Sequence, residues 1–559
     1  MTSDSETLFG ETSPPRVRKR KKAKSKPVFK PYNQEQVMLL PPSVGELIPE
    51  KHLVRVVNET IDRLNIEPLV ATYKGDGASA YHPLMLLKVL VYAYLTKTYA
   101  SRMIAKALTE NIHFMWLSGM SRPDFHTINT FRSSRLKGVI DQVFGSMVFF
   151  LLENGYVDLH DYFVDGTKLR ADNNKHKVVW AKNTKRYKEN VQHKINELLE
   201  QIERTNTEEQ ERYGDRNLEE LGEETTLTSE AVKEQTQRLN EILQRTTAAP
   251  KPTAKALKEI TTKLLPKLEH YEQQEKTLAG RNSYARTDPD ATVFRMKDQQ
   301  LLPAYNLLLG TQKQFVLNYS FHQRKASESD AFIAHMTRCH QLLGQYPSLA
   351  MGDSAYGSEE NYHFLAQHQI GSYLKFNTFH LEQQTKYRSN PYRKENFAYD
   401  QTTDSYQCPQ ERQMTFKQSR CILTDNGYQT FVRLYQCVDC RDCPVASQCK
   451  RGEGPRSIMI NPTLEVYRAQ VRSNLNSEMG IFLRKQRGTD VEPVFGDIKF
   501  NQGYHRCRLR GQAKVNVEIG LLSIAHNLKK VALAPKPPIA HVTCMALPAL
   551  YCSTMSKYF

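Results

Sequence analysis

The sequence predicts an α/β fold, in which a mixed core is preceded by an all-helical region and interrupted by one helical and one cysteine-rich insertion. Three observations support this prediction. Apolar residues recur at helical spacing early in the chain, short strand-like runs alternate with helices in the middle, and two polar stretches separate those runs from a final apolar helix. The 559 residues suffice for three or four domains of roughly 150 residues each.

Composition and charge narrow the class of protein. The chain is 40% hydrophobic and 25% charged, which is typical of a globular protein. Its 77 basic and 60 acidic residues give a net charge of +17, which favours a polyanionic partner, either nucleic acid or an acidic membrane surface. No apolar run reaches the roughly 18 residues of a membrane helix, and the N-terminus lacks the apolar core of a secretory signal. We therefore expect a cytoplasmic protein without a membrane partner.

Residues 1–34 are predicted to form a disordered basic arm. Nine basic residues and no acid lie between Arg16 and Lys30, so this stretch cannot bury apolar area. It is either a solubilising tail or a segment that contacts phosphates without reading sequence. At the other end, residues 536–559 are expected to be a peripheral tail.

Residues 35–155 are predicted to be helical. The apolar run His82–Thr96 is long enough for a buried helix. Ser101 can cap a helix over Arg102–Thr109, and Asn111–Gly119 ends on a glycine stop. Several short helices on short turns are therefore expected here.

A fourth helix of this region opens at Asp124 or Thr127 and carries a polar face. Four side chains lie about one turn apart along it: His126, Asn129, Arg132 and Arg135. Such a face suits a helix-turn-helix that enters the DNA major groove, with the two arginines contacting DNA. The alternative is a small helical bundle that only supports another domain.

The first insertion, residues 176–280, is rich in Lys, Glu, Gln and Arg, with Leu and Ile every three to four residues. This pattern predicts long amphipathic helices, similar to a coiled coil and broken between Pro250 and Pro252. We expect no chemistry there.

Around this insertion the pattern changes to strands. Strands are predicted at 157–165, Thr292–Met296, Tyr305–Leu309, Phe315–Phe321, Ser348–Met351 and Ile370–Phe376, with a helix at Ser327–Leu343. Asp165 and Asp353 directly follow apolar strand segments, and ligands bind at the carboxyl ends of strands in α/β sheets. Taken singly, either aspartate could be a turn former beside glycine. Their order, followed by a late helix with Glu492, is the order of a ribonuclease-H-like fold, expected over 156–380 and 456–535.

Glu492 and Lys499 are seven residues apart, so on a helix they share a face about 10 Å apart. The carboxylate could reach a metal ion while the ammonium holds a phosphate. Alternatively, Thr489 and Glu492 form a capping box, with Glu492 only stabilising a helix start, and Pro493 fits the first turn of such a helix.

Six of the ten cysteines lie in the second insertion, residues 385–455. Cys437, Cys440, Cys443 and Cys449 have the spacing C-x2-C-x2-C-x5-C, and Cys408 lies upstream beside a proline. Thiolates two residues apart are typical of a structural zinc site, so a zinc-ribbon-like segment is expected. Cysteines without metal and an iron–sulfur cluster are the alternatives.

Arg506, Arg508 and Arg510 alternate with other residues downstream of Glu492. A basic run of this kind can follow a DNA backbone. It can equally be a solvated strand edge, but the nearby Lys499 favours DNA contact.

The chain resembles a DDE-type transposase of a bacterial insertion sequence, in the group whose third acid carries a Tyr, Arg, Glu, Lys signature. The resemblance extends from about Tyr32 to about Lys530. It rests on YFVDGTKLRA, TDPDATVFRMKD, PAYNLLLG, MGDSAYGS, VEPVFGDIKFNQGYHRCRLRG, HPLMLLKVLVYAYL and DFHTINTFR. One departure stands out. The family's Arg precedes Glu by four positions, where this chain has Gly488, with Arg487 one residue further back and Phe482 as the nearest aromatic.

The resemblance implies that Asp165, Asp353 and Glu492 are catalytic and bind two Mg²⁺, or Mn²⁺, ions. Such a site cleaves DNA strands at the ends of a mobile element and transfers them into a target. The expected partner is double-stranded DNA, as terminal inverted repeats and target, bound by a homodimer in the nucleoid of a bacterial cytoplasm. The basic residues expected to contact DNA are Lys499, Arg487, Arg506, Arg508, Arg510, Arg132 and Arg135. The alternatives are a related metal-dependent nuclease and a catalytically inactive DNA-binding protein.

Overall fold

The computed structural model describes residues 43–73, 80–213, 227–245, 251–323, 329–424 and 427–534. The predictions for the basic arm and for the C-terminal tail lie outside these residues. The chain divides into two compact units, Met1–Leu47 and Ile48–Phe559. The described part of the first unit contains one 3₁₀ turn, Val44–Leu47. The other described residues belong to the second unit.

The second unit begins with short helices, as the sequence predicts. They are α1 (Leu53–Asp62), α2 (Glu67–Val70), α3 (Pro83–Leu95), α4 (Ser101–Glu110), α5 (Ile112–Leu117), α6 (Phe125–Thr130), the π-helical turn η2 (Phe131–Arg135), the 3₁₀ turn η3 (Leu136–Gly138) and α7 (Ile140–Glu153). His82 caps α3 by accepting from the Leu84 N–H, and Asp124 caps α6 by accepting from the Thr127 N–H. Ser101 is the first residue of α4 rather than its cap.

A six-stranded mixed sheet follows. Its strands are β1 (Asp161–Arg170), β4 (Thr292–Arg295), β5 (Leu301–Gln312), β6 (Phe315–Phe321), β7 (Leu349–Gly352) and β8 (Gly371–Leu374). Strand β6 pairs with β5, and the path continues through β1 and β7 to β8, while β4 also pairs with β5. The β5 pairings are antiparallel, whereas β1, β7 and β8 are parallel to one another. The antiparallel strands β5 and β6 lie on one side of β1, and the parallel strands β7 and β8 lie on the other. This is the arrangement of a ribonuclease-H-like core.

The central strands are buried, which explains their continuous apolar runs. Tyr162, Phe163 and Val164 of β1 are all buried, as is β5 after its first residue. Gly310 on β5 is required by close packing, because a Cβ there would lie 1.8 Å from the Tyr162 hydroxyl oxygen. That hydroxyl bonds to His335 Nε2 at 2.9 Å, on helix α12 (Ser329–Leu343).

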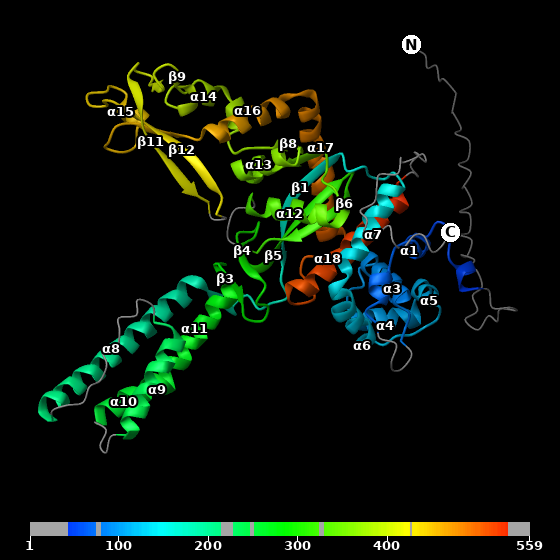
Figure 1. Ribbon diagram of the computed structural model, residues 1–559. Helices are drawn as coiled ribbons and strands as arrows, with labels where there is room; N and C mark the ends of the chain where they lie inside the picture. The colour runs from blue at the N-terminus through cyan, green and yellow to red at the C-terminus, as the bar shows by residue number, and fades with distance from the viewer. Residues whose placement is uncertain are drawn as a thin grey trace, which may run out of the picture. The chain divides into compact units, whose positions relative to one another are not determined.

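The helical region and the sheet share one hydrophobic core. It runs from Ile48 to Leu528 without a break between the two. The connection is α18 (Gln512–Leu533), which packs against α3, α7 and β6 (Figure 1). None of the helices in the described ranges is long and apolar enough to cross a membrane.

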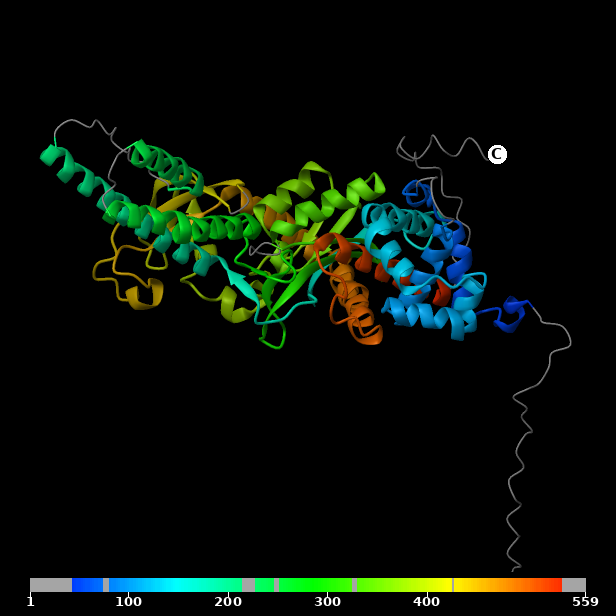
Figure 2. The ribbon, with the colours of Figure 1, turned by 90° about the horizontal axis from the view of Figure 1, so that it is seen from below.

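The helical segment that follows β1 begins and ends in a two-stranded ribbon, β2 (Val178–Trp180) with β3 (Ser283–Ala285). Its helices are α8 (Ala181–Tyr213), α9 (Ser229–Arg245), α10 (Lys251–Glu259), the π-helical turn η4 (Ile260–Leu264) and α11 (Leu265–Leu278). They lie side by side in both ribbon views and bury their own apolar cluster (Figures 1 and 2). Pro252 lies in the first turn of α10, where Pro is tolerated.

The cysteine-rich segment contains a five-stranded antiparallel sheet that the sequence analysis missed. It comprises β9 (Ala398–Asp400), β10 (Ser405–Gln407), β11 (Gln413–Leu423), β12 (Gln429–Cys437) and β13 (Ser457–Ile460). The short helix α15 (Ala446–Cys449) lies between β12 and β13, and α16 (Pro462–Asn476) and α17 (Glu478–Gly496) lead back to the core. Helix α13 (Glu359–Gln367) packs against α16, and α17 packs against β1, β5 and β7.

Candidate active site

Two carboxylates lie next to each other on the central parallel strands. The last parallel pair of β1 and β7 is Val164 with Gly352, and Asp165 and Asp353 are the residues directly after it. Asp353 follows the end of β7, and its carboxylate accepts from the Ser354 N–H at 2.7 Å. Asp165 is in the middle of β1, which continues to Arg170, and accepts from the Gly166 N–H at 2.8 Å.

The third acid comes from α17. Glu492 lies well inside this helix, and the Thr489 hydroxyl donates to the Gln486 carbonyl within it, so the capping-box interpretation is wrong. Pro493 also lies inside the helix, where its missing N–H leaves the Thr489 carbonyl without its usual partner. The side chain of Gln314 fills this place, because its Nε2 donates to the Thr489 carbonyl at 2.8 Å.

Arg487 connects the first and third acids. Its Nη2 lies 3.0 Å from Asp165 Oδ2, and its Nη1 lies 3.8 Å from Glu492 Oε1. The Arg487 side chain is only 13% exposed. The arginine that departs by one position from the family signature is therefore the one that contacts the carboxylates.

The three carboxylates act on one another electrostatically. Burial raises the pKa of Asp165, and the charges of Asp353 and Glu492 raise it further, while Arg487 and the Gly166 N–H oppose them. Burial lowers the pKa of Lys375, just after β8; Arg487 lowers it further, and Asp353 and Glu492 oppose that shift. The three carboxylates therefore share one partly buried site with the guanidinium of Arg487 and the ammonium of Lys375.

The side chain of Lys499 contacts β1, the strand that carries Asp165. Lys499 belongs to the π-helical turn η8 (Asp497–Asn501), and its Nζ donates to Thr167 Oγ1 at 2.5 Å and to the Lys168 carbonyl at 3.0 Å. Burial, with the charges of Lys297 and Lys168, lowers its pKa to about 8. A positive charge is therefore held two to three residues along β1 from the acids.

Sequence reasoning missed the residues that fix this turn. Asp497 Oδ2 bonds to His526 Nδ1 at 2.9 Å, and its Oδ1 accepts from Lys529 Nζ at 2.7 Å. Burial opposes ionisation, but these partners hold the pKa of Asp497 well below its usual range. No spacing signal connects residues 497 and 526, because the contact depends on how α18 packs.

The arginines downstream have different surroundings. Arg506, Arg508 and Arg510 are exposed and alternate with the buried Cys507. Two of them pair with Asp172: Arg510 Nε lies 3.0 Å from its Oδ2, and Arg506 Nη2 lies 2.5 Å from its Oδ1. Their role in binding DNA stays a prediction.

The two arginines of the helical region both make contacts within the fold, and the role of Arg135 in binding DNA stays a prediction. Arg132 is 4% exposed, and its Nη1 donates to the Tyr99 carbonyl at 2.7 Å and to the Tyr94 hydroxyl at 3.4 Å. Arg135 is half-buried, donates to the Thr72 carbonyl and stacks on the Tyr73 ring. The placement of Arg132 in a DNA-reading face is therefore wrong, because its guanidinium is used inside the fold.

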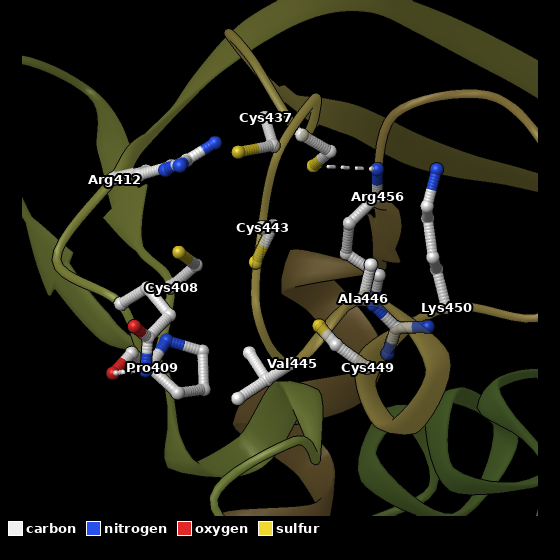
Figure 3. A pocket seen from close by; sticks show the side chains of 12 residues that line it. Cys408, Pro409, Arg412, Cys437, Cys443, Val445, Ala446, Cys449, Lys450 and Arg456 are labelled. Carbon is white, nitrogen blue, oxygen red and sulfur yellow. Dashed lines mark hydrogen bonds between the residues drawn. The ribbon is translucent and has the colours of Figure 1, made fainter.

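Five of the six cysteines of the second insertion line one cavity: Cys408, Cys437, Cys440, Cys443 and Cys449 (Figure 3). Burial raises the pKa of Cys449, and so do the nearby thiols of Cys408, Cys440 and Cys443. Across the described ranges, however, no three His, Cys, Asp or Glu side chains are positioned so that they could hold a metal ion without moving.

The chemistry of the three acids nevertheless fits a hard divalent cation. Carboxylate oxygens are the ligands that Mg²⁺ prefers, and like charges this close need a counter-ion. The guanidinium of Arg487 serves as that counter-ion between Asp165 and Glu492. A metal ion at these two carboxylates would have to take its place.

Comparison with protein families identifies the class. Residues 407–532 match the family model of a Transposase DDE domain, and residues 42–134 match a Transposase domain (DUF772). The first match includes Glu492 and Lys499, whereas Asp165 and Asp353 lie before it. No curated protein matches the chain significantly. These two matches support a DDE-type transposase of an insertion element. Members of that family cleave DNA, transfer its strands and generally use a divalent metal.

Proposed function

We propose that Asp165, Asp353 and Glu492 are the catalytic carboxylates and that they hold Mg²⁺, or Mn²⁺ in its place. The observation that carries this proposal is their convergence from β1, β7 and α17, with Asp353 and Glu492 both raising the pKa of Asp165. Three carboxylates that repel one another destabilise the fold unless cations neutralise them. Such a cluster is therefore typical of a functional site.

When bound, two divalent cations can activate the attacking hydroxyl and stabilise the leaving oxygen of a phosphodiester. The residues of this chain supply the rest. Arg487, which contacts Asp165 and Glu492, would be free to pair with a phosphate once cations take its place at these carboxylates. Lys375 lies near Asp353 and Glu492, Lys499 contacts β1 further along from Asp165, and both offset the charge of the DNA backbone.

The partner that this arrangement supports is double-stranded DNA, bound as the inverted repeats at the element's ends and as target. Arg506, Arg508 and Arg510 extend the basic surface beyond Lys499. In this proposal the catalytic domain comprises residues 156–380 and 456–535, with insertions at 176–280 and 385–455, and the helices of 35–155 contribute to DNA binding. A homodimer would hold two element ends together.

The decisive experiment is cleavage of DNA that carries the element's own ends, with Asp353→Asn compared with the wild type. We expect Mg²⁺-dependent nicking at the end boundaries, reduced at least about 100-fold in the variant, since a metal ligand is lost. Asp161→Asn is the matched control, because Asp161 lies on β1 but pairs with His160.

Three other outcomes of this experiment would each contradict the proposal. Cleavage that ignores the element ends would favour a nuclease, and binding without any cleavage would favour an inactive DNA-binding protein. Full activity in Asp353→Asn would show that the carboxylates are wrongly assigned.

A further inference from the structure

Five cysteines of the second insertion come from separate pieces of chain but face one space. Cys408 is in the turn after β10, Cys437 ends β12, Cys440 and Cys443 lie in the following loop, and Cys449 ends α15. Figure 3 shows the sulfur atoms of Cys408, Cys437, Cys443 and Cys449 around the same space. The cavity between them has a volume of about 20 Å³, the size of a single small occupant rather than of an organic ligand.

The loop around this cavity has little else to stabilise it. The small sheet buries only Phe397, Met414, Tyr435, Cys437 and Ile458 as its apolar cluster. The stretch between β12 and β13 contains only the four-residue helix α15, and all of these cysteines are free thiols. Segments with so little core are usually held by a disulfide or a metal ion.

Cys437 differs from the other four thiols in its burial. The Sγ of Cys440 accepts the Arg456 N–H at 3.3 Å. The Sγ of Cys437 lies 3.3 Å from the Asp439 carbonyl oxygen. Cys437 is also 2% exposed and belongs to the apolar cluster.

The remaining four form a set. Cys449 has Cys408, Cys440 and Cys443 as its thiol neighbours. Cys440 and Cys443 have the two-residue separation of a zinc knuckle, and Cys408 lies in a tight turn where its N–H bonds to the Arg412 carbonyl. Arg412, Lys450 and Arg456 line the same cavity and would offset the negative charge of four thiolates.

We propose that Cys408, Cys440, Cys443 and Cys449 bind one structural Zn²⁺ and that Cys437 is a core residue. Binding turns these thiols toward a common point, and each releases its proton as its Zn–S bond forms. Four protein ligands leave no open position, so the ion stabilises the fold of the segment and takes no part in phosphodiester chemistry.

The test is metal analysis of the full chain purified under reducing conditions, with Zn²⁺ as the probe. We expect about one zinc per chain in the wild type and in Cys437→Ser, and loss of most of it in Cys443→Ser and Cys449→Ser. Cys421→Ser, an exposed thiol on β11, is a second control. Wild-type protein without zinc, bound iron, or loss of zinc in Cys437→Ser alone would each overturn the proposal.

A second measurement does not depend on the variants folding. Wild-type protein reconstituted with Co²⁺ should show the intense visible bands of a tetrahedral site and the ultraviolet bands of thiolate-to-metal charge transfer. A weak octahedral spectrum would contradict the proposal. Neither readout uses DNA cleavage, so the zinc site can fail while the carboxylate site stands, and the reverse.

Discussion

At the scale of single residues, Arg487 is the most informative side chain. It neutralises Asp165 and Glu492 from within the chain, in the place where a bound cation would act. We expect Arg487→Gln to lower the stability of metal-free protein by about 1.5–3 kcal/mol, since bonds to charged groups are lost. The same variant should gain more stability from Mn²⁺ than the wild type, because no guanidinium has to be displaced.

Thermal unfolding in a chelator and in Mn²⁺ measures both effects. Lys485→Gln is the matched control, since it removes an exposed charge from the same helix without touching the acids. An equal Mn²⁺ response in wild type and Arg487→Gln would show that the guanidinium does not compete with the metal.

At the scale of elements, the turn η8 sets the charge of Lys499. Its ammonium is held against β1, where its pKa falls to about 8. A folded-state pKa below the unfolded value means that the neutral form gains population as pH rises through 8. We therefore expect DNA affinity of the metal-free protein to fall between pH 7 and pH 9 by more in the wild type than in Lys499→Gln.

Fluorescence anisotropy with end DNA at constant ionic strength measures this difference. Lys514→Gln, an exposed lysine on α18, should keep the wild-type pH profile. Parallel pH profiles of DNA affinity for wild type and Lys499→Gln would show that Lys499 does not contact DNA.

The elements also show what a sequence can predict. Strand β7 is an apolar run followed by Asp353, so its end could be predicted. The predicted strand end at Asp165 is wrong, because β1 continues past it to Arg170. The contact of Arg487 could not be predicted, because it depends on the rotation of α17 against the sheet. The small sheet was missed because β11 is almost entirely exposed, so its residues carry no inward and outward alternation.

At the scale of the whole molecule, the helical region and the sheet are one folding unit. Arg132 and Glu518 lie near each other inside the shared core, and both bond to the Tyr94 hydroxyl. The burial of these side chains could not be predicted from residue spacing alone. An arginine at helical spacing can lie either on a DNA-reading face or in a core. Only the packing of α18 against α3 distinguishes the two.

We expect Arg132→Met to lower the free energy of unfolding by about 3–5 kcal/mol, since Glu518 would remain buried without its compensating charge. Urea unfolding of the full chain measures this effect, with the exposed Arg122→Met as control. The salt dependence of DNA binding should be unchanged in folded Arg132→Met. A shallower salt dependence of DNA binding with unchanged stability would show that Arg132 contacts DNA.

The pairing of β1 with β7 has a consequence for how this chain can change over evolution. Asp165 and Asp353 are neighbours because the register fixes Val164 opposite Gly352, and a shift by one residue would turn either carboxylate to the other face. Both additional segments join the chain after the aspartate that precedes them. These segments can therefore lengthen, shorten or be exchanged without changing which face of the sheet each residue of β1 and β7 points to. Mutation can remodel them while Asp165 and Asp353 keep their positions.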